Sequence, residues 1–204
     1  MIRTTLLNPW NTAISTIRSK INLLTWQELA FAVVGGVAIA VVGKFLGRTL
    51  HLIWPVPMSG SLAAALPRTI ISLMILLRTK RFGMLTIAGV TEVSTGLSIG
   101  FIGWLPMSLL VPLLTGVAGD LIWRQLKKLP SRKIALVLAG GGICGARMLI
   151  ALFFWTILSR PIFTAPEYLA IILGGIVIAN IILGMLAGLV VGKSVATKIN
   201  GNDR

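Results

Sequence analysis

The sequence predicts an all-α, polytopic membrane protein with six transmembrane helices. Of its 204 residues, 56% are hydrophobic and only 12% are charged, and the mean hydropathy is +0.94. Such a chain has too little polar surface to cover a soluble fold. A membrane-spanning helix needs about 20 mostly apolar residues, whereas the strands of a membrane barrel alternate in hydrophobicity over about 10 residues. The apolar segments of this chain have the helical length.

The apolar segments follow one another along the chain and are separated by more polar loops. They are Glu28–Gly47, Gly60–Leu77, Gly83–Gly103, Met107–Trp123, Ile134–Leu158 and Tyr168–Val191. Each is long enough to cross the hydrocarbon core as a helix. We therefore expect one transmembrane domain over residues 26–195, a lead-in over residues 1–25 and a cytoplasmic tail over residues 196–204.

Basic residues predict the orientation of the spans, because cytoplasmic loops carry an excess of Lys and Arg. One set of segments contains Arg3, Arg18, Lys20, Arg78, Lys80, Arg81, Arg124, Lys127, Lys128, Arg132, Lys133, Lys193, Lys198 and Arg204. The loops of the opposite side contain Arg48, His51 and Arg160. Both termini are therefore predicted to be cytoplasmic. Topology accounts for the net charge of +14, so we expect no nucleic-acid partner.

The lead-in does not have the pattern of a cleavable signal peptide, because Asn8 and Pro9 interrupt its short apolar run. Ile14, Ile17 and Ile21 recur instead at helical spacing. This spacing favours a short amphipathic helix on the cytoplasmic leaflet. A disordered tail is the alternative.

Motifs for catalysis and metal binding are missing from the sequence. Cys144 is the single cysteine and His51 the single histidine, so neither a thiolate cluster nor a histidine metal site is expected. The chain has no G-x-x-x-x-G-K-[ST] motif for ATP and no recognisable nucleophile–base arrangement. We expect no enzymatic activity and no cofactor, and any ATP hydrolysis should take place in a separate subunit.

Glu92 is one of five acids in the chain and lies near the middle of the third predicted span. An ionisable residue in hydrocarbon indicates a functional site by default. At a rise of 1.5 Å per residue, Arg147 lies at a similar depth and Arg68 in the outer half of its span. Glu92 either pairs with one of these arginines or faces an outward-opening cavity that holds a cationic or hydrogen-bond-donating solute. Asp120, nearer the cytoplasm, is expected to pair with Arg124 at i+4.

Further candidate contacts to a solute lie toward the outer side. Asn180 lies near mid-depth in the sixth span, Trp54 and Trp104 lie in outer loops, and Trp155 lies in the last outer turn of the fifth span. Aromatic residues at this depth anchor helices at the membrane interface or stack on a planar heterocycle or a cation. Both interpretations stay open. The candidate binding residues are Glu92, Trp54, Trp104, Arg147, Trp155 and Asn180.

Small residues recur every four positions in two of the spans and give each a flat face on which another backbone can approach closely. In the first span the stripe is Ala32, Gly36 and Ala40, and it predicts either packing within the bundle or an external docking surface. In the sixth span the stripe is Asn180, Gly184, Gly188 and Gly192, and packing within the bundle is favoured.

Together these features resemble a known family. Six helices, cytoplasmic termini, about 200 residues, no ATPase motif, the stripe of Ala32, Gly36 and Ala40 and a long first outer loop are similar to the substrate-binding S component of an energy-coupling factor (ECF) vitamin transporter. The stretch from Thr91 to Gly96, the Trp104-Leu105 turn and the run from Gly116 to Asp120 before a basic loop resemble the thiamine-precursor (hydroxymethylpyrimidine) type.

The resemblance implies a location, partners and a mechanism. The protein would lie in the plasma membrane of a prokaryote, capture a vitamin or precursor from outside, and topple against a transmembrane coupling subunit that two cytoplasmic ATPase subunits drive. Ala32, Gly36 and Ala40 would form the docking surface. Two other functions stay open: a self-sufficient ion-coupled carrier with Glu92, Arg147 and Asp120 as a relay, and a noncatalytic membrane scaffold.

Overall fold

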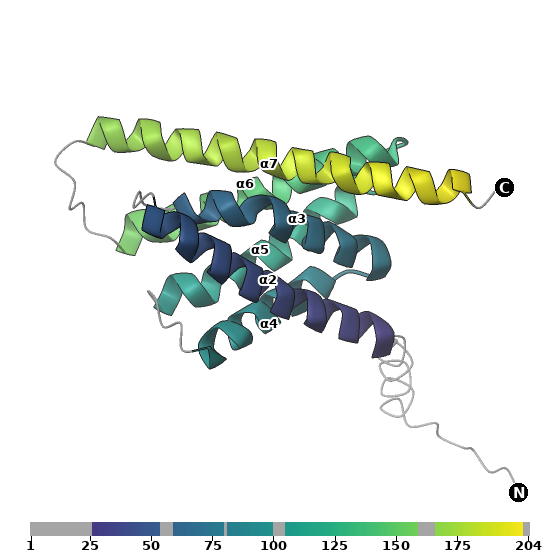
Figure 1. The fold of residues 1–204 in the computed structure, drawn as a ribbon, viewed down its shortest axis with the longest axis horizontal. Helices are drawn as coiled ribbons and strands as arrows, with labels where there is room; N and C mark the ends of the chain where they lie inside the picture. Colours follow the sequence, from purple (N-terminus) through teal and green to yellow (C-terminus); the bar gives the residue numbers. More distant parts are fainter. Residues whose placement is uncertain (1–25, 54–58, 80, 100–104, 159–165, 202–204) are drawn as a thin grey trace, which may run out of the picture.

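The computed structural model describes residues 26–53, 59–79, 81–99, 105–158 and 166–201. All of the regular structure in these ranges is α-helical. The helices are α2 (Trp26–Ile53), α3 (Ser59–Thr79), α4 (Met84–Ser98), α5 (Leu105–Leu126), α6 (Arg132–Leu158) and α7 (Pro166–Gly201), labelled as in Figure 1. The predicted all-α fold is therefore confirmed.

Five of these helices are long and apolar enough to cross a membrane, and α4 is the exception. It has 15 residues, which at 1.5 Å per residue makes a helix of about 22 Å, shorter than the hydrocarbon core of about 30 Å. Within the described residues, the predicted third span, Gly83–Gly103, is helical from Met84 to Ser98, and its residues 100–103 lie outside the described part. Hydropathy identified the apolar run but did not predict that the helix ends at Ser98.

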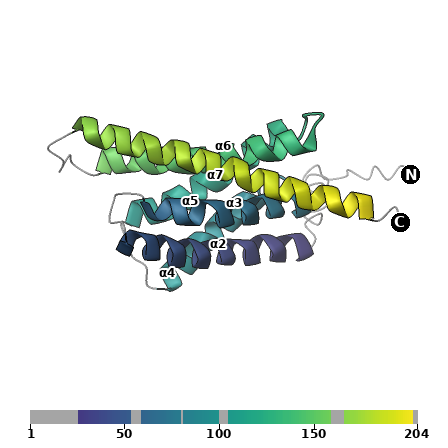
Figure 2. The same ribbon diagram turned by 45° about the horizontal axis from the view of Figure 1, so that its top comes forward.

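The helices form a bundle in which α2 and α4 lie on one side, α6 and α7 on the other, and α3 and α5 between them (Figures 1 and 2). Successive helices run in opposite directions, as short connections between neighbours require. The start of α2 and the end of α7 consequently lie at the same end of the bundle (Figure 1). The loop between α3 and α4 lies at that end too. In this loop Nε of Arg81 lies 3.1 Å from Oε2 of Glu28 on α2.

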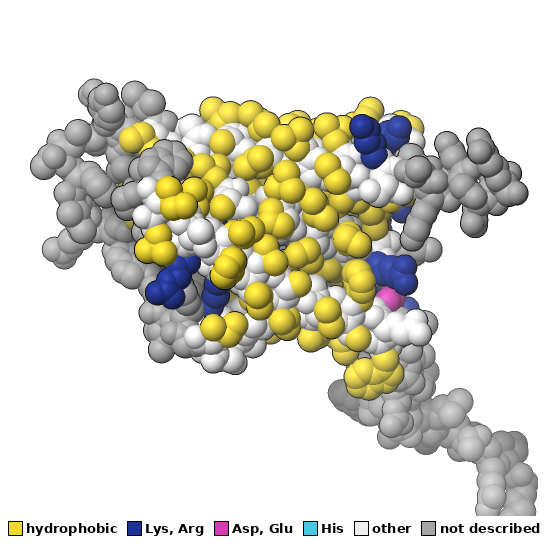
Figure 3. Space-filling model, viewed as in Figure 1, with side chains coloured by type: hydrophobic (Ala, Val, Ile, Leu, Met, Phe, Trp, Pro, Cys, Tyr) yellow, Lys and Arg dark blue, Asp and Glu magenta, His cyan; other side chains and the backbone are white. Residues whose placement is uncertain are grey.

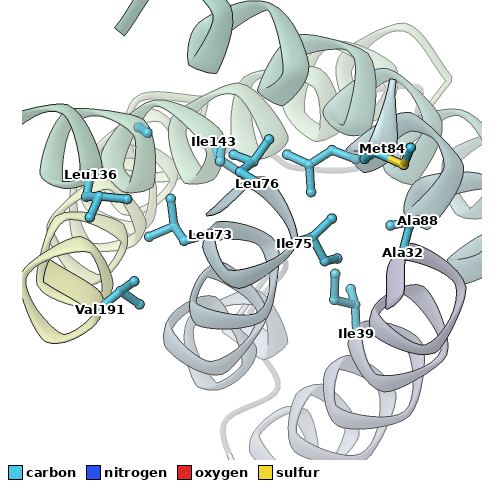
Figure 4. Close-up of a cluster of buried hydrophobic side chains, with 12 residues drawn as sticks. Ala32, Ile39, Leu73, Ile75, Leu76, Met84, Ala88, Leu136, Ile143 and Val191 are labelled. Atoms are coloured by element: carbon cyan, nitrogen blue, oxygen red, sulfur yellow. The ribbon is translucent and has the colours of Figure 1, made fainter. Parts of the chain in front are cut away.

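The outer surface of the bundle is largely apolar. Hydrophobic side chains cover the middle of the face in Figure 3, whereas Lys and Arg gather toward its two ends. Inside, Leu73, Ile75 and Leu76 of α3 lie between Leu136 and Val191 on one side and residues of α2 and α4 on the other (Figure 4). An apolar surface around a core that also contains charged groups is the distribution expected when lipid is the solvent.

Glycines set the closest helix contacts. On α6 and α7, a Cβ added at Gly140 would overlap the carbonyl oxygen of Gly184, and one added at Gly188 would overlap that of Leu136. Gly192, by contrast, has only ordinary contacts, the nearest at 3.7 Å. The prediction that the stripe of the sixth span packs within the bundle is therefore confirmed: Gly184 and Gly188 make the closest contacts, and Asn180 and Gly192 are buried too.

The stripe of the first span also packs inside the chain. Ala32 and Ala40 are buried, and a Cβ on Gly36 would meet the backbone of Ala88 and lie 2.8 Å from the Cβ of Thr91, both on α4. Of the two interpretations of this stripe, packing within the bundle is the one observed. At Gly36 the expected docking surface is covered by α4, because a flat small-residue face fits any close backbone and α4 of the same chain supplies one.

Asp120 of α5 caps the first turn of α4. Leu85 N donates to Oδ1 at 3.2 Å, and Thr86 donates to Oδ2 through its backbone N at 2.9 Å and its hydroxyl at 2.7 Å. Gly83, which precedes α4 with φ at 93°, has no capping side chain, so the carboxylate supplies the acceptors and the negative charge that a helix start favours.

This cap replaces the ion pair predicted between Asp120 and Arg124. In the described structure no salt bridge joins them, and the guanidinium of Arg124 instead lies 6.0 Å from the ring centroid of Phe82. The i+4 spacing was compatible with a pair, but the amides of α4 compete for the same carboxylate and bind it with three hydrogen bonds. Asp120 therefore has a structural role, as predicted, but its partner is the first turn of α4 and not Arg124.

Asp120→Asn is expected to lower the free energy of unfolding by about 1–3 kcal/mol, because the amide accepts at one position where the carboxylate accepts at two. Arg124→Gln is the matched control and should change it by no more than about 0.5 kcal/mol. Reversible unfolding in mixed detergent micelles measures both. Equal losses in the two variants would point back to an Asp120–Arg124 pair.

Candidate functional site

Glu92 of α4 and Arg147 of α6 form an ion pair with two hydrogen bonds inside the bundle. Arg147 donates from Nη1 to Oε2 at 3.2 Å and from Nη2 to Oε1 at 2.6 Å. Only 7% of the surface of Glu92 is exposed. The planar guanidinium matches the two carboxylate oxygens. The predicted pairing of Glu92 is therefore confirmed, with Arg147 as its main partner.

Arg68 of α3 approaches the same carboxylate from another side. Its Nη2 lies 3.9 Å from Oε1 of Glu92, and its Nε is buried without a hydrogen-bond partner among the described residues. Gly43 of α2 makes room for this side chain, since a Cβ there would overlap the guanidinium. Packing against α2 thus holds the guanidinium of Arg68 beside the carboxylate of Glu92.

Lys44, the next residue on α2, contributes the third cation. Its Nζ donates to the carbonyl oxygen of Gly96 at 2.8 Å, close to the C-terminal end of α4. A cation is favourable there because the last carbonyls of a helix have no partner within the helix. Gly96 allows this approach, since a Cβ at that position would lie 2.8 Å from Nζ.

These four charged residues line one cavity of about 380 Å³. The rest of its wall comes from α4, α5 and α6: Val93, Gly96, Leu97, Met107, Ser108, Val111, Pro112 and Ala151. The volume falls in the range of about 300–1,000 Å³ that is typical of small-molecule sites, and an apolar wall with a few convergent polar groups is typical of them too. The cavity lies toward the end of the bundle where α4 ends and α5 begins.

The structure brings some of the candidate binding residues together and not others. Glu92 and Arg147 line the cavity. Asn180 is buried nearby and donates to the hydroxyl of Ser61 at 3.2 Å and the carbonyl of Ile176 at 2.9 Å. With Arg68 and Arg147 it lines a second, smaller cavity of about 30 Å³, room for about one water molecule. Asn180 therefore lines the smaller cavity and is not in the wall of the main one.

The predicted aromatic contacts are not part of the described cavity. Trp54 and Trp104 lie outside the described residues. Trp155 is described and half-buried in α6, one turn beyond Ala151, but it is not among the residues that line the cavity. Whether the two outer-loop tryptophans contact a solute stays a prediction.

Lys44 and Arg68 complete the site, and neither was among the candidate binding residues. From the sequence, Arg68 is expected only as a partner for Glu92, and no role is predicted for Lys44. The signal for both was the same as for Glu92: an ionisable residue within a transmembrane segment. The sequence does not show that Lys44, Arg68 and Arg147 all lie in the wall of the same cavity as Glu92. In that wall, three cations surround one carboxylate.

Comparisons with models of known protein families, with characterised proteins and with solved structures give no match. Within the described residues, no group of three or more His, Cys, Asp or Glu side chains is placed to hold a metal ion. The chemistry available in the described cavity is therefore that of three cations and one carboxylate: ion pairing and hydrogen-bond donation to a bound molecule.

Proposed function

We propose that this chain is the membrane-embedded, solute-binding subunit of an ECF-type importer and that it captures a vitamin or vitamin precursor on the outer side of a prokaryotic plasma membrane. The observation that carries the proposal is the cavity of about 380 Å³ with Lys44, Arg68, Glu92 and Arg147 in its wall. Charges are expensive in a membrane bundle and are retained where they serve a site.

The position of the cavity supports capture from outside. The described basic residues at the opposite end of the bundle include Arg78, Arg81, Arg124, Lys127, Lys128, Arg132, Lys133 and Lys193. By the positive-inside rule that end faces the cytoplasm. The cavity then lies in the outer half of the membrane, where a solute arriving from outside reaches it without crossing the bundle.

The proposed partners are a transmembrane coupling subunit and two cytoplasmic ATPase subunits. Their support is the resemblance, together with the absence of an ATP-binding motif from the sequence. Ala32, Gly36 and Ala40 do not offer them a free surface, because Gly36 packs on α4 and the two alanines are buried. A coupling subunit would dock on another face of the chain. A thiamine-related solute likewise rests on the resemblance alone.

Uptake into vesicles tests the function against its two rivals. The purified chain, in liposomes with a proton or sodium gradient, is expected to bind its solute without accumulating it. Accumulation should need the coupling subunit, the ATPase subunits and ATP. Gradient-driven accumulation by the chain alone would identify an ion-coupled carrier, and a chain that binds no solute would be a scaffold.

A further inference from the structure

The charges of the cavity do not balance. Three cations, Lys44, Arg68 and Arg147, share its wall with one carboxylate, Glu92. The other described acids are used elsewhere, since Glu28 lies against Arg81 and Asp120 caps α4. The remaining two acids of the chain, Glu167 and Asp203, have side chains outside the described part. The described wall thus has an excess of two positive charges.

An excess of this kind is unfavourable in a low-dielectric interior unless a counter-charge enters. A cationic solute would increase the excess of positive charge. A neutral solute would displace water from the cations and would not replace the screening that the water supplied. From this balance we infer that the solute is an anion, a small molecule with a carboxylate or a phosphate group. The inference rests on the proposed function and names the substrate class of the same cavity.

The geometry indicates where the anionic group binds. Glu92 occupies Arg147 with two short hydrogen bonds. Arg68 also lines the cavity, and its Nη2 lies 3.9 Å from Oε1 of Glu92, so the carboxylate holds it less closely than it holds Arg147. Guanidinium groups bind carboxylate and phosphate oxygens through paired N–H donors. Arg68 is therefore the main anchor, with Lys44 adding charge on the same side.

This inference reverses the expected role of Glu92. A carboxylate that faced the cavity alone would select a cation, but this one is neutralised by Arg147 and approached by Arg68. Its role is to hold Arg147 in position and to lower the repulsion among the three cations. The solute recognised by the site would accept hydrogen bonds from arginine and lysine.

Matched pairs of acids and their amides test the inference on the full-length protein in detergent micelles. Nicotinate is compared with nicotinamide, and biotin with biotinamide, by ligand-induced shifts in thermal unfolding and by native mass spectrometry. For at least one pair the acid is expected to bind at least about tenfold more tightly than its amide, because charge-assisted hydrogen bonds favour the acid. Arg68→Gln should bring the ratio toward one. Arg78→Gln, on the exposed end of the same helix, should leave it unchanged.

The outcomes separate this inference from the function on which it rests. Equal binding of acid and amide, or a neutral or cationic molecule retained through purification, would overturn the anion inference and leave solute binding standing. Chloride alone stabilising the protein as much as the acids would also overturn it, since the site would then hold an inorganic ion. A protein that retains no solute and responds to no probe would contradict the proposed function itself.

Discussion

Replacing Glu92 by Gln is expected to lower the free energy of unfolding by about 3–5 kcal/mol, the usual effect of removing one member of a buried ion pair. The carboxylate is bound by Arg147 at 2.6 and 3.2 Å and lies 3.9 Å from Arg68. Without it, three cations face one another in the wall of the cavity. Reversible unfolding in mixed detergent micelles measures the loss.

Arg147→Gln should be less harmful than Glu92→Gln, because Glu92 keeps Arg68 and Lys44 as neighbours. The double variant should be more stable than the sum of the two single losses predicts, since it removes a cation and an anion together. Glu28→Gln is the matched control, because it breaks the pair with Arg81 at the end of the bundle; its loss should not exceed about 1 kcal/mol. Additive losses in the double variant would contradict the pair as the source of the effect.

Exchanging Gly188 for Ala is expected to lower the free energy of unfolding by about 1–3 kcal/mol, as overpacking of a close contact does. The new Cβ would overlap the carbonyl oxygen of Leu136 and lie 2.6 Å from the Cα of Val137. Both neighbours are backbone atoms of α6, so relief requires the two helices to separate. Unfolding in detergent micelles, with helix content followed by circular dichroism, measures the effect.

Gly192→Ala is the control four residues further along the same face of α7. Its Cβ would have its nearest neighbour, a side-chain carbon of Lys133, at 3.7 Å, which is an ordinary contact. Ala is the better helix former, so this variant should be as stable as the original protein or slightly more so. Similar losses at both positions would mean that α6 and α7 do not approach as closely at Gly188 as the structure has it.

Apolar length predicted most of the fold, because lipid requires each span to satisfy its own backbone hydrogen bonds. The predicted segment Ile134–Leu158 lies within α6, Arg132–Leu158, and ends at the same residue. The segment Gly83–Gly103 ran past the end of α4 because hydropathy continues through Ile99 while the helix does not. Where a helix ends depends on its neighbours and its caps, and those contacts are long-range in sequence.

The sequence predicted some residues of the site, but it did not predict the charge balance of the cavity. Glu92 and Arg147 were found because intramembrane charges are conspicuous, and their pairing followed from similar depth. The charge balance of the cavity did not follow, because it depends on which faces of α2 and α3 turn inward. Gly43 illustrates the difference: in the sequence it is one glycine among 22, and only the structure shows it making room for Arg68.

Native mass spectrometry of the full-length protein, released from micelles after purification at low salt, tests the central claim most directly. We expect one small molecule bound per chain, retained by Arg78→Gln and lost from Arg68→Gln, because the solute is held in the cavity by Arg68. A chain that carries no bound molecule in any preparation, or one that keeps it equally in both variants, would contradict the account.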